Sequence, residues 1–295
     1  MGWRVLESVC PICRGADRKV IGSRGGPAHR NGHGVMTTVV RCRAYGCFYA
    51  SPTLVPDSNP YVLETADAYF HAHDPARKRQ TSHDLAAFAE SVLRRKGRML
   101  EVGCGRGELL EGARARGWAV FGIEMTPEFA AIAETAGITV ERPPVETAEL
   151  LRAHYDVILF AAILEHLYDP LGVLRRARRA LPQGGLIFVD VPNEASLAMS
   201  LGNLYMRATG RAWAVNLSPT CPPFHVVGFT AACLRGALAL AGFRVLVLRK
   251  PRGANVAPAP RTVREFIENA GLTAASRLGR CIGMGDGLRC WAAAV

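Results

Sequence analysis

Residues 99–107 read MLEVGCGRG, and this stretch limits the possible fold more than any other. Its first residues form the short apolar run expected of a strand that is buried between helices. Gly103, Gly105 and Gly107 follow, and the next residues, GELLEGARARG, predict a helix. Because glycine adopts backbone angles that a side chain forbids, such a turn lets the main chain approach a ligand closely. The stretch predicts a ligand-binding glycine turn in an α/β domain.

Strand-like and helix-like segments alternate after this turn, which predicts a mostly parallel sheet. A helix over 84–96 is expected before the first strand. The expected strands lie at 99–102, 118–124, 138–142, 155–160, 186–193, 243–248 and 285–295. The predicted fold class is therefore α/β, with a doubly wound sheet of seven strands.

Acidic residues stand at two informative positions around the turn. A dinucleotide-binding turn has the pattern G-x-G-x-x-G, but Glu108 stands where its last glycine belongs. The turn is instead preceded by Glu101, two residues before the first glycine. Glu124 ends the second strand, about twenty residues further on, where a carboxylate can accept hydrogen bonds from both hydroxyls of a ribose. NAD and S-adenosylmethionine enzymes share this last feature, so it does not separate them.

The order E-x-G-x-G-x-G, acidic strand end, E-H-x-x-D-P and G-G-x-(apolar)₅-P-N resembles the class I S-adenosylmethionine methyltransferases over about residues 84–250. The resemblance implies a Rossmann-like fold whose last strand is antiparallel, and an enzyme that uses S-adenosylmethionine. It also implies a set of cofactor-binding residues around the glycine turn and the following strand ends. These are Glu101, Gly103, Cys104, Gly105, Gly107, Glu124, Met125, Val145, Glu146, Phe160 and Ala161.

Residues 193–224 interrupt the alternation and contain two Met, one Tyr, one Trp and three Pro residues. An insertion after the fifth strand lies over the carboxyl ends of the strands, where open α/β sheets bind ligands. We interpret it as a lid over the acceptor; the alternative is a packing excursion without substrate contact. The pattern H-x-x-x-F-T that follows at 225–230 resembles a turn in relatives that methylate sugars and secondary metabolites.

Two histidines are candidates for the proton acceptor in methyl transfer to a hydroxyl, because a histidine can titrate near neutral pH. His166 lies in E-H-L-Y-D-P, and His225 ends the lid. Each has a non-catalytic alternative: His166 could close over the cofactor, and His225 could be bonded to backbone. A related group of O-methyltransferases acting on quinone precursors holds a metal partly through an acid three positions before the Glu-His pair. Ala162 stands there, so catalytic Mg²⁺ is not expected.

Residues 1–55 contain two cysteine pairs, Cys10 with Cys13 and Cys42 with Cys47. Two such pairs about thirty residues apart are typical of a zinc ribbon, in which four thiolates bind one structural Zn²⁺ tetrahedrally. Metal binding would supply the folding energy that so small a segment lacks. His29 and His33, between the pairs, are possible substitute ligands. The alternative is four unrelated reduced cysteines.

The predicted domains are a zinc-ribbon-like module (1–55), a connector (56–83) and the methyltransferase domain (84–295) with its lid. The connector carries Tyr61, Tyr69, Phe70 and His71, and we expect it to lie over the mouth of the cofactor site.

Composition excludes several classes of protein. With 49% hydrophobic residues the chain can bury a core, yet no apolar run is long enough to span a membrane. The N-terminus lacks a secretory signal pattern, so a cytoplasmic location is the default expectation. The formal charge of +11 invites nucleic-acid binding, but only four of the 36 basic residues are lysines. We attribute this charge to a compositional preference for arginine rather than to a binding surface.

The leading hypothesis is O-methylation of a small-molecule, sugar or natural-product acceptor, with nitrogen or carbon as less favoured acceptor atoms. A second hypothesis is an RNA methyltransferase that reads RNA through the zinc module; it lacks an interleaved aromatic and basic pattern and an Asn/Asp-Pro-Pro-Tyr motif. A third is a non-catalytic zinc-binding scaffold. The sequence names neither the acceptor nor the oligomeric state.

Overall fold

The computed structural model describes residues 2–58, 75–145, 147–149, 153–251 and 262–295. Among these residues, seven strands form one sheet in the order β12-β13-β10-β9-β6-β7-β8. Their bounds are β6 (Arg98–Val102), β7 (Ala119–Ile123), β8 (Thr139–Glu141), β9 (Val157–Ala161), β10 (Leu186–Pro192), β12 (Phe243–Arg249) and β13 (Gly287–Ala294). Strands β8, β7, β6, β9 and β10 are parallel, whereas β13 runs antiparallel between β10 and β12. The predicted mostly parallel, seven-stranded sheet is confirmed.

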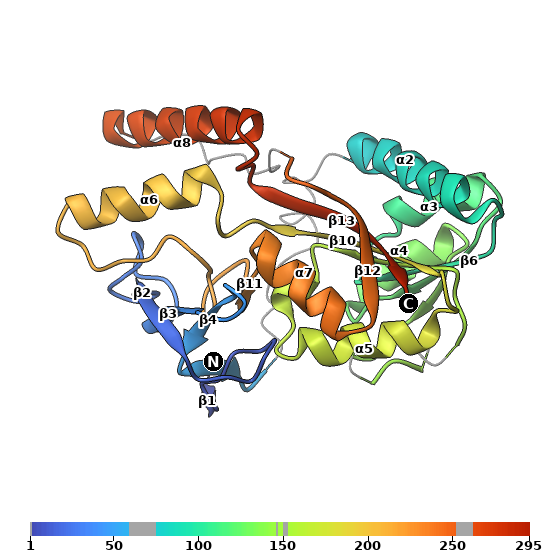
Figure 1. Cartoon of the computed structure of the whole chain (residues 1–295), viewed down its shortest axis with the longest axis horizontal. Coiled ribbons are helices and arrows are strands. Elements are labelled where there is room, and N and C mark those ends of the chain that lie inside the picture. Colours follow the sequence, from blue (N-terminus) through green and yellow to red (C-terminus); the bar gives the residue numbers. More distant parts are fainter. Residues whose placement is uncertain (1, 59–74, 146, 150–152, 252–261) are drawn as a thin grey trace.

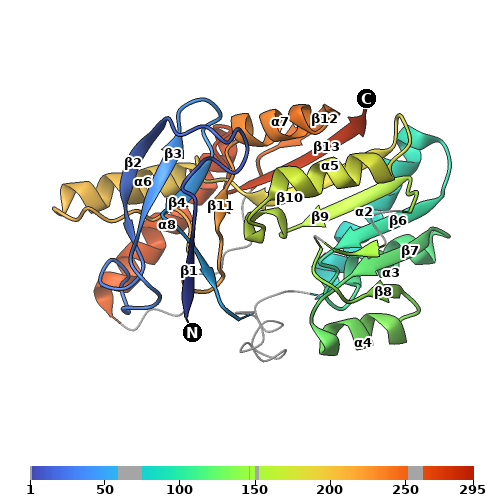
Figure 2. The same cartoon turned by 90° about the horizontal axis from the view of Figure 1, so that it is seen from below.

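Helices cover both faces of this sheet, giving a three-layer domain (Figures 1 and 2). One face carries the buried residues of α5 and α7. The other carries those of α2, α3 and α4. The bounds are α2 (Pro75–Leu93), α3 (Glu108–Ala115), α4 (Pro127–Thr135), α5 (Pro170–Ala180) and α7 (Ala231–Leu240). Helix α2 begins earlier than the expected start at residue 84.

Helix α5 begins at a side-chain cap that the sequence predicts. Asp169 is the N-cap, and its carboxylate accepts a hydrogen bond from the backbone N–H of Gly172 at 3.0 Å. Pro170 occupies the first turn, where its missing N–H costs nothing. We expect Asp169→Ala to lower the free energy of unfolding by about 1 kcal/mol, because a helix N–H loses its partner. Urea denaturation of both proteins measures the difference; unchanged stability would show that the cap contributes nothing.

The N-terminal residues form two small antiparallel sheets. Strands β1 (Trp3–Leu6) and β5 (Thr53–Pro56) pair with each other. The second sheet contains β2 (Arg18–Arg24), β3 (Thr37–Cys42), β4 (Phe48–Ser51) and, at its edge, β11 (Val227–Gly228). Strand β11 comes from the segment directly after the lid. The sheet of the predicted zinc module is therefore completed by a strand of the predicted methyltransferase domain.

The lid and the N-terminal strands also contact each other directly. The segment 193–224 contains helix α6 (Leu197–Ala208), which lies beside α8 (Val263–Cys281) at the end of the molecule that carries β2 and β3 (Figure 1). The N–H of Ser23 donates to the carbonyl of Ala212, and the N–H of Ala214 donates to the carbonyl of Ser23. The lid is thus fastened to the N-terminal module as well as to β10.

Buried polar groups hold the base of the lid. The Asn216 amide donates to both the backbone and the side-chain oxygen of Glu194, at 2.9 and 2.7 Å. Asn203 in turn donates to the Asn216 side-chain oxygen at 2.6 Å. Because buried polar groups are costly unless paired, this network specifies one path for the lid.

Two further expectations concern the connector and membrane-spanning segments. The aromatic residues of the connector, Tyr61, Tyr69, Phe70 and His71, lie outside the described residues, so their predicted position over the cofactor site stays a prediction. Within the described residues, we find no helix with both the length and the apolar character that a membrane span requires.

Candidate active site

The glycine turn lies at the carboxyl end of β6, as the sequence predicts. Gly103, Gly105 and Gly107 all have positive φ angles, at 70°, 55° and 83°. A Cβ at Gly103 would come within 2.9 Å of the Ile163 side chain, and one at Gly107 would collide with Ile138. A Cβ at Gly105 would meet no atom within 4 Å. The turn is therefore packed on two sides and open at its middle glycine, which is the shape a bound ligand requires.

The two predicted acidic residues flank this opening. The Glu124 carboxylate accepts hydrogen bonds from the backbone N–H groups of Gly105 and Thr126, at 2.9 and 2.8 Å. A carboxylate offers about four acceptor positions, so Glu124 keeps capacity for ribose hydroxyls. Glu101 is only 3% exposed, and one of its carboxylate oxygens has no partner among the described residues. Burial raises the pKa of Glu101. A cationic ligand group would satisfy this unpaired oxygen.

Other predicted cofactor residues have different surroundings. Cys104 is buried, and burial raises the pKa of its thiol, so the side chain fills space behind the turn. Phe160 and Val145 have buried side chains that belong to the core of one sheet face. Met125 is 42% exposed beside the turn, and Ala161 is partly exposed at the end of β9. Glu146 lies outside the described residues.

The structure brings together the two candidate histidines, which the sequence offered as alternatives. The rings of His166 and His225 meet edge to face, with centroids 4.9 Å apart. Burial lowers the pKa of His166 to about 4 and that of His225 to about 3. Both imidazoles are therefore neutral at physiological pH, and neither has the near-neutral pKa on which their choice as candidates was based. His166 is held by the backbone carbonyls of Pro223 and Phe224, whereas no hydrogen bond of the His225 ring is found among the described residues.

Glu165 is a member of this cluster that sequence reasoning did not single out. It is 2% exposed, and one carboxylate oxygen has no hydrogen-bond partner among the described residues. Burial, with Asp190 and Glu194 nearby, raises the pKa of Glu165 to about 8. One ligand atom from each of Glu165, His166 and His225 lies within 4.8 Å of the others. The E-H motif was the available signal, but it did not show that the carboxylate is buried.

Residue types decide which metal this cluster would suit. Two imidazoles and one carboxylate are ligands typical of zinc or iron rather than of Mg²⁺, which prefers oxygen. Ala162, where the related quinone-precursor enzymes carry an acid, offers no side-chain ligand. The residues present therefore do not fit a magnesium site.

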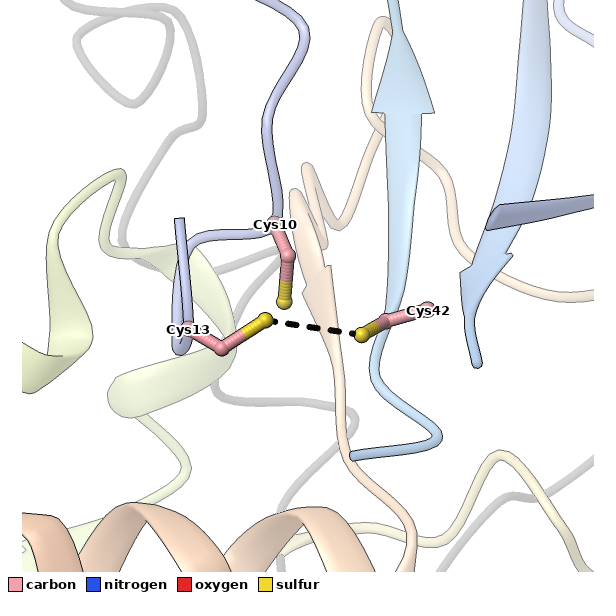
Figure 3. Close-up of side chains that lie close together, drawn as sticks. All are labelled: Cys10, Cys13 and Cys42. Atoms are coloured by element: carbon pink, nitrogen blue, oxygen red, sulfur yellow. Dashed lines mark hydrogen bonds between the residues drawn. The ribbon is translucent and has the colours of Figure 1, made fainter. Parts of the chain in front are cut away.

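Three of the four predicted zinc ligands come together in the N-terminal module. The sulfur atoms of Cys10, Cys13 and Cys42 point toward one another (Figure 3) and lie within 4.8 Å of each other. The Cys13 and Cys42 sulfurs are 3.7 Å apart. Tetrahedral zinc with Zn–S bonds of about 2.3 Å separates its sulfurs by about 3.8 Å. The backbone N–H of Tyr45 also donates to the Cys42 sulfur at 3.4 Å, which favours a thiolate there.

Cys47, the fourth predicted ligand, lies at the edge of this group. Its thiol interacts with Cys10 on one side and with Cys233 of helix α7 on the other. This contact lowers the pKa of the Cys10 thiol. His29 and His33 stack on each other in the loop, with ring centroids 5.1 Å apart, and are not members of the cysteine cluster. Neither Cys47 nor the two histidines belongs to the group of ligand atoms that lie within 4.8 Å of one another, so Cys47 as fourth ligand stays a prediction.

The sheet order and the glycine turn together define a Rossmann-like methyltransferase domain, and solved structures share its fold. The plantazolicin methyltransferase BpumL in complex with SAH aligns with a TM-score of 0.52 and 16% identity, covering 80% of this chain and 91% of that one. A SAM-dependent methyltransferase from Archaeoglobus fulgidus aligns with a TM-score of 0.50 and 19% identity, covering 73% and 94%. At these identities the similarity shows the fold alone.

Residues 71–248 match the family described as "Methyltransferase domain", and the chain belongs to this family. Ubiquinone biosynthesis O-methyltransferases are among its relatives. The one from Pseudomonas savastanoi pv. phaseolicola is 33% identical over 130 residues, which cover 41% of this chain and 53% of that protein. The one from Marinobacter nauticus is 33% identical over 134 residues, covering 41% and 56%. The chain thus spans about half the length of the curated relatives it matches.

Proposed function

We propose that the protein is an S-adenosylmethionine-dependent methyltransferase. The observation that carries this proposal is the open middle of the glycine turn, where a Cβ at Gly105 would meet no atom within 4 Å. Glu124 accepts from the Gly105 N–H, and Glu101 has a buried oxygen without a partner among the described residues. An unpaired, buried carboxylate oxygen suits the ammonium of the methionine part. The remaining acceptor capacity of Glu124 suits the two ribose hydroxyls.

When bound, S-adenosylmethionine supplies a methyl group that is already electrophilic because it is attached to a sulfonium. The protein's own residues must then position the acceptor, exclude water and take a proton. Ile163, which packs against Gly103, lies between the turn and the histidine pair along the chain. His225 is neutral, and its ring is free of hydrogen bonds among the described residues, so it is our proposed proton acceptor. His166, which the Pro223 and Phe224 carbonyls hold, orients His225 through ring contact.

We expect His225→Ala to lower kcat by about 10²- to 10⁴-fold, the usual contribution of a general base, while S-adenosylmethionine affinity stays unchanged. His166→Ala should have a smaller effect, because it loses only the orienting contact. Turnover by mass spectrometry and affinity by calorimetric titration separate the two quantities. Added imidazole should restore part of the activity of His225→Ala. Full activity in both variants would show that neither histidine takes part in methyl transfer.

Metal analysis of the same variants tests whether Glu165, His166 and His225 bind a metal ion instead. If Glu165, His166 and His225 held a metal, the purified protein would contain one metal more than the cysteine cluster explains, and His225→Ala would lose it. If His225 is the proton acceptor, as we propose, the unmodified protein and His225→Ala contain the same amount of metal, and added imidazole restores part of the activity of His225→Ala.

We propose that the acceptor is a hydroxyl of a small molecule, such as a sugar or natural product. Two observations support it: the relatives named ubiquinone biosynthesis O-methyltransferases, and the hydrogen bonds that hold the segment 193–224, our proposed lid, in one place directly after β10. Incubating the protein and labelled S-adenosylmethionine with panels of sugars, phenols and structured RNA tests the acceptor class. Transfer to RNA with a strong salt dependence would favour the RNA-methyltransferase alternative. Failure to bind S-adenosylmethionine would favour the non-catalytic scaffold.

We also propose that Cys10, Cys13, Cys42 and Cys47 bind one structural zinc ion. The 3.7 Å separation of the Cys13 and Cys42 sulfurs and the N–H donor from Tyr45 support it. Four thiolates leave no open coordination position, so the role is structural rather than catalytic. We propose the domain division expected from the sequence (1–55, 56–83 and 84–295), with the module extended to the end of β5 at Pro56 and the methyltransferase domain begun with α2 at Pro75. Strand β11 joins the module to the methyltransferase domain.

A further inference from the structure

The loop that closes the second cysteine pair packs directly on helix α7. A Cβ at Gly236 would collide with the Tyr45 ring, and one at Gly46 would come within 3.2 Å of the Thr230 hydroxyl oxygen. Thr230 is the N-cap of α7, and Gly236 lies in its second turn. Because these contacts leave no room for a larger residue at Gly236, the loop and the start of the helix are fitted to each other.

A cysteine of the helix lies between these two contacts. Cys233 is three residues from Thr230 and three from Gly236, and residues at this spacing are neighbours on a helix surface. Its thiol interacts with that of Cys47, and both side chains are buried. The backbone N–H of Cys233 donates to the Thr230 hydroxyl oxygen at 3.1 Å, so the helix cap fixes its position. A fifth sulfur, supplied by the methyltransferase domain, therefore adjoins the proposed zinc site.

Metal binding would set the direction of the hydrogen bond between these two thiols. A cysteine that binds zinc gives up its proton, so Cys47 becomes a thiolate and can only accept. Cys233 then keeps its proton and donates it through an S–H···S hydrogen bond. Groups that donate to metal ligands hold those ligands in place, and their loss lowers metal affinity by about 10- to 100-fold.

The charge of the site also suits this contact. Four thiolates around Zn²⁺ leave a net negative charge, and Cys233 stands in the first turn of α7, where the helix dipole stabilises negative charge. Cys10, Cys42, Cys47 and Cys233 all belong to one buried cluster. Because little water reaches this cluster, a protein group has to supply any hydrogen bond that the Cys47 thiolate accepts.

We propose that Cys233 is a positioning residue of the zinc site, with its thiol donating a hydrogen bond to the metal-bound Cys47 thiolate. Zinc binding then fastens the N-terminal module to α7, so that the metal joins two parts of the chain in addition to folding one of them. This inference rests on the zinc site proposed above and does not depend on methyl transfer.

The test compares Cys233→Ala with Cys290→Ala, both in the full chain. Cys290 is also buried, but it lies in β13 of the large sheet, and its thiol donates to the backbone carbonyl of Trp291. Both substitutions therefore remove one buried sulfur. Competition with a chelator of known zinc affinity should show about 10- to 100-fold weaker zinc binding in Cys233→Ala and unchanged binding in Cys290→Ala. Cys233→Ser, whose hydroxyl can also donate, should recover part of the loss.

Cobalt(II) in place of zinc distinguishes the hydrogen bond from packing alone. Co²⁺ takes the same thiolate ligands and absorbs light by charge transfer from sulfur to the metal. A hydrogen bond to a thiolate stabilises its lone pairs, so losing the donor moves this absorption to longer wavelength. We expect the shift in Cys233→Ala and no shift in Cys290→Ala.

A measurement on the unmodified protein serves if Cys233→Ala does not fold. Iodoacetamide, with mass spectrometry as the readout, should leave Cys233 unmodified in the zinc-bound protein and alkylate it after a chelator removes the metal. Cys290 should stay protected in both states. Continued protection of Cys233 after complete loss of zinc would overturn the proposal, as would equal zinc affinities and equal cobalt spectra in Cys233→Ala and Cys290→Ala. A full chain that takes up no zinc would overturn the zinc site itself and this inference with it.

Discussion

Gly105→Arg is expected to abolish S-adenosylmethionine binding while leaving the protein folded. Gly105 has a φ of 55°, and a Cβ there would meet no atom within 4 Å. An arginine side chain would fill the space proposed for the ligand and pair with Glu101 or Glu124. Calorimetric titration should detect no binding, and circular dichroism should retain the native spectrum.

Gly184→Arg controls for the backbone strain of this substitution. Gly184 also has a positive φ, 78°, and a Cβ there likewise meets no atom within 4 Å. It precedes β10, at the opposite end of the strands from the glycine turn. Both variants introduce the same side chain at a strained position, but only Gly105→Arg should lose the ligand. Equal binding by the two variants would disprove the proposed site.

Removal of the proposed zinc is expected to unfold the N-terminal module and to abolish methyl transfer. Structural zinc contributes on the order of 10 kcal/mol to the folding of small zinc-binding segments. Cys10→Ser or a strong chelator should therefore make the backbone amides of β2, β3 and β4 lose their protection against hydrogen exchange. Strand β11 pairs with β4 through Val227 and Tyr49, so the His225 segment should lose its support at the same time. Hydrogen exchange and zinc content measure both effects.

Cys281→Ser is the control, because it replaces a cysteine that lies outside the proposed zinc site. Cys281 is exposed in α8 and lies apart from the cysteine cluster. This variant should keep its zinc, its exchange protection and its activity. S-adenosylmethionine binding in Cys10→Ser should largely persist, because the glycine turn and Glu124 follow β6 and β7 of the large sheet, none of whose strands pairs with the N-terminal sheets. Intact amide protection after complete loss of zinc would show that the metal is not structural.

The large sheet was predictable because each of its elements has a local signal. The buried strand before Gly103, the cap at Asp169 and the glycines between elements follow from backbone sterics and hydrogen bonding within a few residues. The strand bounds differ from the expected ones by one or two residues. The start of α2 was misplaced because residues 75–83 lack the apolar periodicity on which the expectation at 84–96 was based.

The candidate site was predictable in its parts but not in its assembly. Glu101, the turn glycines and Glu124 were identified from spacing. The contact between His166 and His225 joins residues far apart in sequence, and no local pattern reports such a pair. Glu165 is buried, and the charges of Asp190 and Glu194 add to the rise of its pKa; the E-H motif encodes neither effect.

The sequence alone determined that a glycine turn begins a parallel sheet, that acidic residues flank it and that cysteine pairs stand near the N-terminus. These are short-range features, because backbone conformation and ligand spacing depend on neighbouring residues. Only the tertiary structure decided that β11 completes the N-terminal sheet and that Cys47 lies close to Cys233 of α7. Those relations depend on the packing of segments more than a hundred residues apart, which only the folded chain brings together.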